Sequence, residues 1–464
     1  MSEKTYAHFI GAGGAGMSGI ALVLAKRGIR VTGSDLKESR YSRALEAAGV
    51  PVMIGHAAEN LGDPEVVVVS SAIPSTNPEV AAARERGIEV WPRARMLGHL
   101  AGDRKTIAVA GTHGKTTTSS MIATMLSRMD LDPTFLIGGE VDGFNANAAN
   151  GTGEHYVVEA DESDGSFVYL DPYIAIVTNI EADHLDHYGT LEKVEETFCD
   201  FMSRVSPGGA LVVCGDQPHL VDMARSTGHR VVTYGVCDEC DVRATVLGRE
   251  GAGLRFEVLT ADGHVATGVT TIPGVHMASN AVAALATAWV LGLDLQDASD
   301  ALSQFTGVRR RFDLIGERAG VTVVDDYAHH PTEVRATLAA ARTLDFKRVV
   351  VVFQPHRYSR TQALATEFGE AFGDSDLAIL LDVYSAGEAP IPGVTGKTLL
   401  EAVLRAHPRV QVAYLPHRAE VVPYVKSRVR SGDVVFTMGA GDVTALGPEI
   451  VRALSEDGEA ATCQ

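Results

Sequence analysis

The most constraining feature of this sequence is a repeated pattern: a short apolar run, then a glycine- or aspartate-rich break, then a helical stretch. The runs occupy residues 7–10, 66–69, 106–110, 156–158, 174–177, 348–353, 377–383 and 434–437. Most are β-branched and do not alternate with polar residues, which is typical of strands buried on both faces of a parallel sheet. Helical patterns at 19–27, 117–129 and 333–342 lie between the runs. The sequence therefore predicts an α/β fold built from β-α-β units.

Residues 241–272 depart from this pattern. Apolar and polar residues alternate over 254–260 and 265–271, on either side of a turn with the sequence ADGH. This arrangement predicts a hairpin that adds an antiparallel edge to the middle sheet. An alanine-rich helix is expected to follow over 278–291.

The length of 464 residues corresponds to about three domains of ordinary size. A polar stretch at 102–105 and a basic one at 309–311 each precede a new strand. We therefore expect three domains, at 1–104, 105–308 and 309–464.

The overall charge is acidic, with 40 Lys and Arg against 59 Asp and Glu. This balance argues against broad nucleic-acid binding, which needs a basic face. It leaves room for anionic small substrates, because a local cationic pocket can lie in an acidic protein. No apolar stretch approaches the length of a membrane span and no secretion signal is recognisable, so we expect a cytoplasmic protein without membrane insertion.

Cysteine is sparse, with 5 residues, so a disulfide framework is not expected. Cys237 and Cys240 form a C-x-x-C. No second pair of cysteines or histidines follows at the spacing of a zinc finger, so a zinc or redox role is not favoured.

The first glycine-rich loop, GAGGAG at 11–16, directly follows the strand at 7–10 and opens a helix. Glycines there allow a tight turn and let the backbone approach a diphosphate at a helix N-terminus. Asp35 follows the second strand at about the spacing of a ribose-binding acid. By themselves these residues indicate a nucleotide diphosphate, and NAD remains one candidate.

The second loop, GTHGKT at 111–116, follows the strand at 106–110 and is similar to a Walker A loop. It departs from that motif at Val109, where the motif has glycine. Its chemistry is retained: backbone N–H groups surround phosphates, Lys115 supplies a charge for the outer phosphates, and the Thr116 hydroxyl can reach Mg²⁺.

Two acidic loops follow strands of the same expected sheet. The strand at 156–158 ends in EADESD at 159–164, and the strand at 174–177 ends in TNIEADHLDH at 178–187. The carboxyl ends of such strands form the crevice in which open α/β sheets bind ligands. Carboxylates and imidazoles beside a triphosphate suit a divalent metal ion.

The last third of the chain carries polar chemistry after four strands. The segments are 325–333, 354–360, 382–388 and 439–442. Pro331 suits the first position of a helix. Arg357 and Arg360 can each form a bidentate pair with a carboxylate.

Taken together, these motifs resemble the Mur ligase family of cell-wall synthesis, and within it the branch that adds L-alanine to UDP-N-acetylmuramate. The resemblance covers the whole chain, from 11–19 through 111–118, 159–164, 183–186 and 325–333 to 439–443. It implies a Rossmann-like N-terminal domain, a central mixed sheet of the P-loop ATPase type and a C-terminal Rossmann-like α/β domain. It also implies an ATP-dependent ligase of peptidoglycan precursor synthesis that forms an acyl phosphate, and through it a part in cell shape and division. The protein is expected to be a monomer or a homodimer.

The resemblance assigns residues to each substrate. For the UDP-sugar it implies Gly11, Gly13, Gly14, Ala15, Gly16, Met17, Ser18, Asp35 and Ser70. For ATP it implies Gly111, Thr112, His113, Gly114, Lys115, Thr116, Thr117, His276, Asn280, Arg311 and Asp326. For magnesium it implies Thr116, Glu159 and His184. For L-alanine and the reacting carboxylate it implies Tyr327, His329, Arg357 and Arg360. The catalytic set is Lys115, Arg311, His329 and Asp326, with His329 as first and Asp326 as second candidate base for the amine.

Two departures from the family pattern stand out. Met277 replaces the asparagine usual after the motif histidine, and residues 195–204 contain no lysine to be carbamylated near the second metal. The absent lysine fits the alanine-adding branch.

Other functions remain open at this point. One is a recycling ligase that adds a preformed peptide to the same sugar nucleotide, and a folate-type glutamate ligase is more distant. From other classes, a nicotinamide-dependent oxidoreductase would use Asp35 and the first loop. A nucleotide-switched binding protein would use Lys115 and Thr116 but leave the C-terminal loops without a role.

Overall fold

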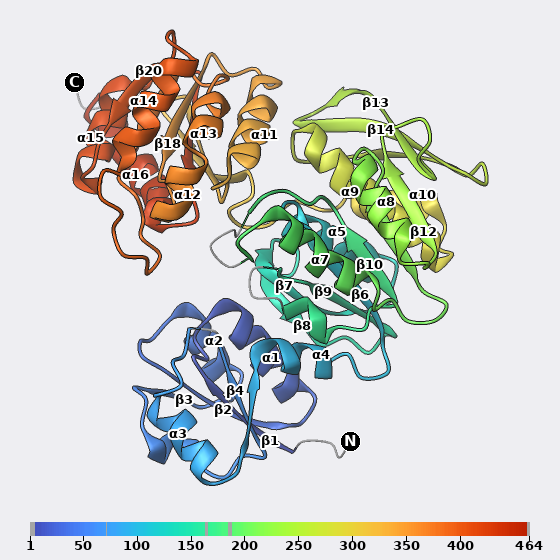
Figure 1. The fold of residues 1–464 in the computed structure, drawn as a ribbon. Helices are drawn as coiled ribbons and strands as arrows, with labels where there is room; N and C mark the ends of the chain where they lie inside the picture. The colour runs from blue at the N-terminus through green and yellow to red at the C-terminus, as the bar shows by residue number, and fades with distance from the viewer. Residues whose placement is uncertain (1–4, 71, 163–165, 184–187, 462–464) are drawn as a thin grey trace. The chain divides into compact units, whose positions relative to one another are not determined.

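The chain folds around three β-sheets in a computed structural model that describes residues 5–70, 72–162, 166–183 and 188–461 (Figure 1). It forms two compact units. The first comprises Met1–Gly248, Arg255–Val269 and Ser279–Phe305, and the second comprises Arg249–Leu254, Thr270–Ala278 and Thr306–Gln464. The predicted α/β class is confirmed, and each sheet falls within one of the three expected segments. The exact domain borders stay predictions.

The first sheet is parallel and has the order β3-β2-β1-β4-β5. Its strands are β1 (Tyr6–Ile10), β2 (Arg30–Asp35), β3 (Val52–Ile54), β4 (Val66–Val69) and β5 (Glu89–Pro92). Its helices are α1 (Ala15–Lys26), α2 (Arg40–Ala47), η1 (Ala58–Leu61), α3 (Pro78–Glu85) and α4 (Arg93–His99). From β1 the chain adds β2 and β3 on one side, and it then adds β4 and β5 on the other side. The strand order therefore reverses between β1 and β4, and the crevice for a ligand lies at the carboxyl ends of these two strands.

The second sheet has the order β15-β14-β13-β12-β11-β10-β6-β9-β7-β8. Its strands are β6 (Lys105–Ala110), β7 (Thr134–Val141), β8 (Ala146–Ala149), β9 (His155–Glu159), β10 (Ile174–Val177), β11 (Ala210–Cys214), β12 (Val231–Gly235), β13 (Val242–Glu250), β14 (Gly253–Thr260) and β15 (Val265–Val269). Its helical elements are α5 (Lys115–Arg128), η2 (Ser166–Tyr169), α7 (Leu191–Met202), α8 (Pro218–Ser226), α9 (Val275–Leu291) and α10 (Leu295–Leu302). The antiparallel pairing of β14 with β15 at the sheet edge confirms the predicted hairpin.

The third sheet has the order β16-β17-β21-β18-β19-β20, with only β16 antiparallel to its neighbour. Its strands are β16 (Asp313–Arg318), β17 (Val321–Asp326), β18 (Arg348–Phe353), β19 (Leu377–Leu380), β20 (Gln411–Tyr414) and β21 (Asp433–Met438). Its helical elements are α11 (Pro331–Arg342), α12 (Tyr358–Ala363), α13 (Ala365–Ala371), α14 (Gly396–Ala406), α15 (Arg418–Arg428), η3 (Asp442–Ala445) and α16 (Leu446–Ala461).

Strand β18 shows why the apolar runs do not alternate with polar residues. Val349, Val351 and Phe353 pack with buried residues of α11, α13 and α14 on one face. Val350 and Val352 pack with buried residues of α15 and α16 on the other (Figure 1). Because helices cover both faces, every position from Val349 to Phe353 is apolar.

Some boundaries differ from those expected from the sequence. Helix α1 begins at Ala15 and α5 at Lys115, so the last residues of both glycine-rich loops form the first helical turn. Strand β19 ends at Leu380 rather than at Val383, and the chain beyond it forms a polar loop. Among the described residues, one disulfide joins Cys237 to Cys240, which is a local link and no framework. None of the helices within the described ranges has the length and apolar character needed to cross a bilayer.

A buried carboxylate ties the first sheet to its helices. Glu79, at the start of α3, accepts hydrogen bonds from His8 Nε2 at 3.1 Å on β1 and from Ser34 Oγ at 2.6 Å on β2. Asn60 Nδ2 donates to the same carboxylate at 2.9 Å. Burial alone would raise the pKa of Glu79, but the hydrogen bonds from His8, Ser34 and Asn60 outweigh burial and lower the pKa to about 2. The charged carboxylate is therefore part of the folded structure.

We expect Glu79→Gln to lower the free energy of unfolding by about 3 kcal/mol at pH 7, the value of a pKa lowered from 4.5 to about 2. Because the folded-state pKa is the lower one, this stabilisation exists above about pH 4.5 and is lost as the pH falls toward 2. The difference between wild type and variant should therefore shrink in acid. Urea unfolding followed by fluorescence of the buried Trp91, in a Trp289→Phe background, measures it.

The control is Glu38→Gln, which removes an exposed ion pair with Arg43 and should change stability by less than about 0.5 kcal/mol. A Glu79 variant as stable as wild type at pH 7, or a gap that widens in acid, would contradict the role assigned to Glu79.

Candidate functional site

The first glycine-rich loop is fastened to the end of β2. The backbone N–H of Gly13 donates to Asp35 Oδ2 at 2.8 Å, and Ser39 Oγ donates to the Gly13 carbonyl at 2.9 Å. A Cβ atom on Gly13 would lie 2.9 Å from Asp35 Oδ2, so a larger residue there would displace the Asp35 carboxylate. Ser70, at the end of β4, faces Gly11, where a Cβ would lie 3.3 Å from its Oγ. The structure therefore brings together Gly11, Gly13, Asp35 and Ser70.

The rest of the predicted UDP-sugar set lies at the start of α1. Gly14 is the N-cap of the helix, and Ala15 and Gly16 open its first turn. Met17 and Ser18 are buried in the helix, and Ser18 Oγ donates back to the Ala15 carbonyl at 2.9 Å. Ligand contact by these two side chains stays a prediction.

A cleft connects this first turn with the second sheet. It is lined by Gly16, Arg93, Leu97, Leu136, Ile137, Gly138, Asn147, Glu159 and Asp161. Gly16 belongs to the predicted sugar-nucleotide site and Glu159 to the predicted metal site. Arg93 contributes a cation: a Cβ on Gly16 would lie 2.9 Å from its Nη1. One residue of the predicted sugar-nucleotide site and one residue of the predicted metal site therefore line the same cleft.

The second glycine-rich loop runs from β6 into α5. Gly111 and Gly114 have φ values of +131° and +83°, which other residues rarely adopt. A Cβ on Gly111 would lie 2.1 Å from Thr178 Oγ1, and one on Gly114 would lie 2.7 Å from Asn280 Oδ1. Both glycines are therefore required by conformation and by close approach. Asn280, predicted at the ATP site, is thereby placed beside the loop.

The backbone of this loop is held by the end of the neighbouring strand β10. Asn179 accepts from the N–H of His113 at 2.9 Å and donates to its carbonyl at 3.0 Å. The Thr112 N–H donates to the Asn179 carbonyl at 3.0 Å. These bonds fix peptides 112 and 113 in one conformation, with the following amides at the N-terminus of α5. That arrangement is suited to phosphate binding.

Thr116 and Glu159 meet as the sequence predicts. The Thr116 hydroxyl donates to Glu159 Oε1 at 3.0 Å, and the Gly138 N–H donates to Glu159 Oε2 at 2.7 Å. A hydroxyl and a carboxylate beside a phosphate loop are oxygen donors of the kind that Mg²⁺ prefers. The donor set fits magnesium. His184, the third predicted ligand, lies outside the described residues.

Lys115 is largely covered and paired. Its Nζ donates to the Gly111 carbonyl at 2.7 Å and to Glu162 Oε1 at 2.8 Å. Burial opposes the charge of Lys115, but Glu162 and its acidic neighbours outweigh it, so the pKa of Lys115 lies above its usual value. Burial raises the pKa of Glu162 to about 7, against the effect of Lys115. The ammonium group is therefore charged and lies at the loop.

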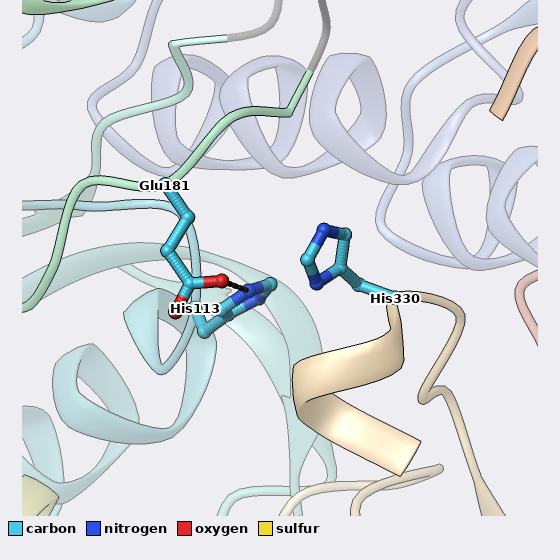
Figure 2. Close-up of side chains that lie close together, drawn as sticks. All are labelled: His113, Glu181 and His330. Atoms are coloured by element: carbon cyan, nitrogen blue, oxygen red, sulfur yellow. Dashed lines mark ion pairs between the residues drawn. The ribbon is translucent and has the colours of Figure 1, made fainter. Parts of the chain in front are cut away.

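His113 forms an ion pair with Glu181, with Nε2 at 3.4 Å from Oε2 (Figure 2). Thr112 Oγ1 also accepts the Glu181 N–H at 2.9 Å. Together with the contacts of Asn179, these bonds join the loop to the acidic segment after β10. His330, which is also labelled in Figure 2, is the N-cap of α11 in the other unit.

In the second unit, two aspartates at the end of β17 hold the turn that carries Arg311. Arg310 Nε lies 3.3 Å from Asp325 Oδ2, and the Phe312 N–H donates to Asp326 Oδ2 at 2.9 Å. Arg310 and Phe312 have φ values of +65° and +51°. Both residues flanking Arg311 therefore adopt a conformation that is costly for a side chain with a Cβ.

The Asp325 carboxylate is almost fully buried and has further partners. Thr437 and Thr444 donate to it through their Oγ1 atoms, at 2.6 and 2.7 Å. Arg310 also donates to the Gly439 carbonyl at 2.7 Å. The turn at 310–312 is thus fastened to β21 and to the loop that follows it.

Asp326 is buried and engaged by the chain itself. Its Oδ1 accepts from the Ala328 N–H at 2.7 Å, while Oδ2 accepts from Phe312. Burial raises the pKa of Asp326 to about 6, although Arg311 beside it opposes the shift. In this structure Asp326 braces the turn. Its predicted contacts with ATP and with the amine stay predictions.

His329 is oriented by two acceptors. Its Nδ1 lies 3.0 Å from the Tyr327 carbonyl and 3.3 Å from Glu333 Oε2. A carbonyl only accepts, so Nδ1 carries a proton, and in the neutral ring the lone pair is on Nε2. Glu333 also lies 3.4 Å from Arg311 Nη1, so one carboxylate links the predicted base and the predicted phosphate-binding arginine.

Arg357 and Arg360 flank the start of α12. Arg357 has a φ of +69° and its Nη1 lies 3.9 Å from Glu388, whereas Arg360 is buried. His356 stacks on Tyr384 with ring centroids 5.6 Å apart and lies edge-on to His329 at 5.9 Å. Burial and the two arginines lower the pKa of His356 to about 4, so it is neutral at pH 7.

His276, which like Asn280 is predicted at the ATP site, lies in the second unit. Burial and the nearby Arg311 lower its pKa to about 4, so its imidazole is also neutral. A Cβ on Gly274 would lie 2.5 Å from His276 Cε1, which explains the glycine two positions earlier.

Several residues of the site were missed by sequence reasoning. They are Arg93, Glu162, Asn179, Arg310, Asp325, Glu333 and His356. All except Arg93 lie in motif segments that the sequence singled out, next to residues that were assigned. Arg93 offered no signal, because it follows a strand that had not been recognised.

Three models of one protein family match consecutive parts of the chain. They are described as the Mur ligase family catalytic domain at residues 6–105, the Mur ligase middle domain at 109–288 and the Mur ligase glutamate ligase domain at 310–441.

Curated relatives match over nearly the whole length. The UDP-N-acetylmuramate–L-alanine ligase of Rubrobacter xylanophilus is 50% identical over 96% of this chain and 99% of its own. That of Anaeromyxobacter dehalogenans is 48% identical over 98% of each.

Solved structures of ligases also match over nearly the whole chain. The UDP-N-acetylmuramate–alanine ligase of Thermotoga maritima matches with a TM-score of 0.81 and 27% identity, over 97% of this chain and 99% of that one. A murein peptide ligase of Psychrobacter arcticus matches with a TM-score of 0.72 and 26% identity, over 97% and 98%. With three family models in sequence and relatives of this identity over almost its full length, the chain belongs to the Mur ligase family.

Proposed function

We propose that this chain uses ATP to join L-alanine to the carboxylate of UDP-N-acetylmuramate, releasing ADP and phosphate. The observation that carries the proposal is the near-full-length identity of 48–50% to ligases of that name, in a chain whose phosphate loop and Thr116–Glu159 pair are formed. The reaction belongs to peptidoglycan precursor synthesis. We place it in the cytoplasm, where ATP and UDP-sugars are supplied, and expect a monomer or homodimer.

Activation of the carboxylate is the first chemical demand, because a carboxylate is a poor electrophile. Its oxygen attacks the γ-phosphate of ATP and gives an acyl phosphate. Two unit negative charges about 4 Å apart repel by about 4 kcal/mol at an effective dielectric of 20. That corresponds to about a thousandfold in rate. Cations must cancel this repulsion.

Lys115 and Arg311 are the cations that we assign to this task. Lys115 is held on the loop by the Gly111 carbonyl and Glu162. When ATP binds, its outer phosphates offer Lys115 a more highly charged partner than Glu162. The backbone at Arg311 is held between two braced residues and its guanidinium contacts Glu333, so the cation is positioned before a phosphate arrives.

Magnesium would be held by Thr116 and Glu159, with His184 as a further predicted ligand. When bound there, it supplies positive charge and orients phosphate oxygens. The adjacent Gly138 N–H keeps the second oxygen of Glu159 in place. The loop amides and α5 position the remaining phosphate oxygens.

The second demand is a neutral amine on L-alanine. We assign the proton acceptor to Nε2 of His329, because its Nδ1–H is directed at the Tyr327 carbonyl and Glu333. Glu333 then stabilises the imidazolium that forms. Arg357 and Arg360 are assigned to carboxylate binding and Tyr327 to the wall of the amino-acid pocket.

The main rival is a ligase that attaches a preformed peptide to the same sugar nucleotide. It is not favoured, because the murein peptide ligase structure matches at 26% identity with a lower TM-score than the alanine ligase structure. The oxidoreductase, the folate-type ligase and the nucleotide-switched binding protein are not favoured either. None of the three requires the match of all three Mur ligase models.

The acceptor assay tests the proposal. With ATP, magnesium and UDP-N-acetylmuramate, phosphate release should depend on L-alanine, be weaker with glycine or L-serine, and be absent with a free tripeptide of the cell wall. Release that depends on the tripeptide and ignores L-alanine would assign the chain to the recycling reaction.

The brace of Arg311 yields a second prediction. We expect Asp325→Asn to lower kcat by about 10- to 100-fold, since a lost charge-assisted contact is worth about 1.5–3 kcal/mol. Arg310→Lys should act similarly, because the lysine lacks the fork that joins Asp325 and Gly439. Steady-state kinetics with each substrate measures the effect.

The matched control is Arg318→Gln, an exposed arginine on β16 in the same unit, which should leave kcat unchanged. If Asp325→Asn and Arg310→Lys melt like wild type and turn over at a normal rate, the brace does not position Arg311.

A further inference from the structure

The connection between β12 and β13 carries a cysteine pair for which the proposed reaction has no use. Cys237 and Cys240 lie in this connection with their Cα atoms 5.6 Å apart, within the range that a disulfide spans, and a disulfide joins them. Cys240 is buried, whereas Cys237 is only partly covered. The two sulfurs therefore differ in their access to reagents.

The backbone of this connection is fixed independently of the sulfurs. Asp216, after β11, accepts the N–H of Cys237 at 2.9 Å and that of Val236 at 3.1 Å. At the other end, Asp241 Oδ2 accepts the N–H and the hydroxyl of Thr233, both at 2.9 Å. Because these bonds hold the loop closed at both ends, the two cysteines stay side by side when the sulfurs are not bonded.

The two sulfurs pack against a glycine that leaves room for them. A Cβ on Gly215 would lie 2.4 Å from Cys240 Sγ and 3.1 Å from Cys237 Sγ. A side chain at position 215 would therefore occupy the space of the sulfur atoms. Spacing, loop anchorage and this space agree in favouring contact between the two thiols.

We propose that Cys237 and Cys240 are a reversible dithiol–disulfide couple and hence a modification site for small-molecule disulfides. The Cys237 thiolate attacks one sulfur of the reagent, forming a mixed disulfide and releasing one thiol. The Cys240 thiolate then attacks Cys237 Sγ, which forms the internal disulfide and releases the second thiol. Two protein thiols are oxidised, one reagent disulfide is reduced to two thiols, and the protons of the protein thiols go to the released thiols.

The other described cysteines serve as internal references. Burial raises the pKa of Cys214 to about 11, and burial also raises the pKa of Cys199. Both therefore hold little thiolate at neutral pH and should exchange slowly. Cys463 lies outside the described residues.

The competing occupant is a thiophilic divalent cation such as Zn²⁺. Asp216, Cys237 and Cys240 offer ligand atoms within 4.8 Å of one another, two sulfurs and one carboxylate. Such a cation would hold both thiols reduced, so it excludes the couple and can be told apart from it.

The test uses the full-length protein, equilibrated in mixtures of reduced and oxidised glutathione. The samples are quenched in acid, alkylated and mapped by mass spectrometry. We expect the peptide that contains both cysteines to lose two hydrogen atoms as the mixture becomes oxidising, and to regain them on reduction. Cys240→Ser should accumulate glutathione on Cys237, whereas Cys237→Ser should acquire it on Cys240 much more slowly. Both variants should retain wild-type ligase activity.

Three results would overturn the proposal. In the first, both thiols remain open to alkylation throughout the redox range. In the second, Cys237→Ser acquires glutathione on Cys240 as fast as Cys240→Ser does on Cys237. In the third, reduced protein binds one equivalent of added Zn²⁺, resists oxidation while it is bound, and loses this binding in Asp216→Asn.

Discussion

The attachment of peptides 112 and 113 to Asn179 is the contact on which the rest of the site depends. It fixes the backbone between β6 and α5, and therefore the position of Lys115 and Thr116 in the first turn of the helix. Thr116 then meets Glu159 from β9, on the other side of β6. A loop that moved freely would hold neither a phosphate nor a metal ligand in a fixed place, and fixed charges are what the reaction requires.

The second unit solves a similar problem by a different means. A single long cationic side chain, Arg311, is positioned by the bracing of its two neighbours and by its own contact with Glu333. Asp325 holds Arg310 and Asp326 holds Phe312, and both neighbours have positive φ. Strain of this kind persists only where the surroundings determine the conformation, and it is concentrated at functional sites. Asp326 was predicted as a substrate contact. Its observed partners, the N–H groups of Phe312 and Ala328, show that it also holds the turn beside Arg311.

Much of the architecture could be predicted because the signals are local. Apolar runs buried on both faces predicted the strands, as β18 illustrates. The glycine-rich turn after β6 predicted that Lys115 and Thr116 lie at the carboxyl end of one sheet, and the spacing after the first loop predicted that Asp35 lies at the carboxyl end of another. The joining of Thr116 with Glu159 followed from the rule that such ends share one edge.

What could not be predicted depends on partners that are distant in sequence or on backbone conformation. Asp325 meets Thr437 and Thr444 more than a hundred positions later, which no local pattern indicates. Glu79 is buried by partners from three other elements, and a lone glutamate at a helix start reads as an exposed cap. The absence of a second pair of cysteines or histidines at zinc-finger spacing argued against a role for Cys237 and Cys240, whereas the anchored loop around them argues for one. His184 lies outside the described residues, so the predicted magnesium ligands are only partly placed.

The central claim is that this chain turns a carboxylate into an acyl phosphate before the amide forms. The most direct measurement starts from UDP-N-acetylmuramate whose carboxylate oxygens carry a heavy isotope, with ATP, magnesium and L-alanine. The account predicts that one labelled oxygen appears in each molecule of inorganic phosphate released with the amide. Unlabelled phosphate, formed in step with the amide, would contradict it.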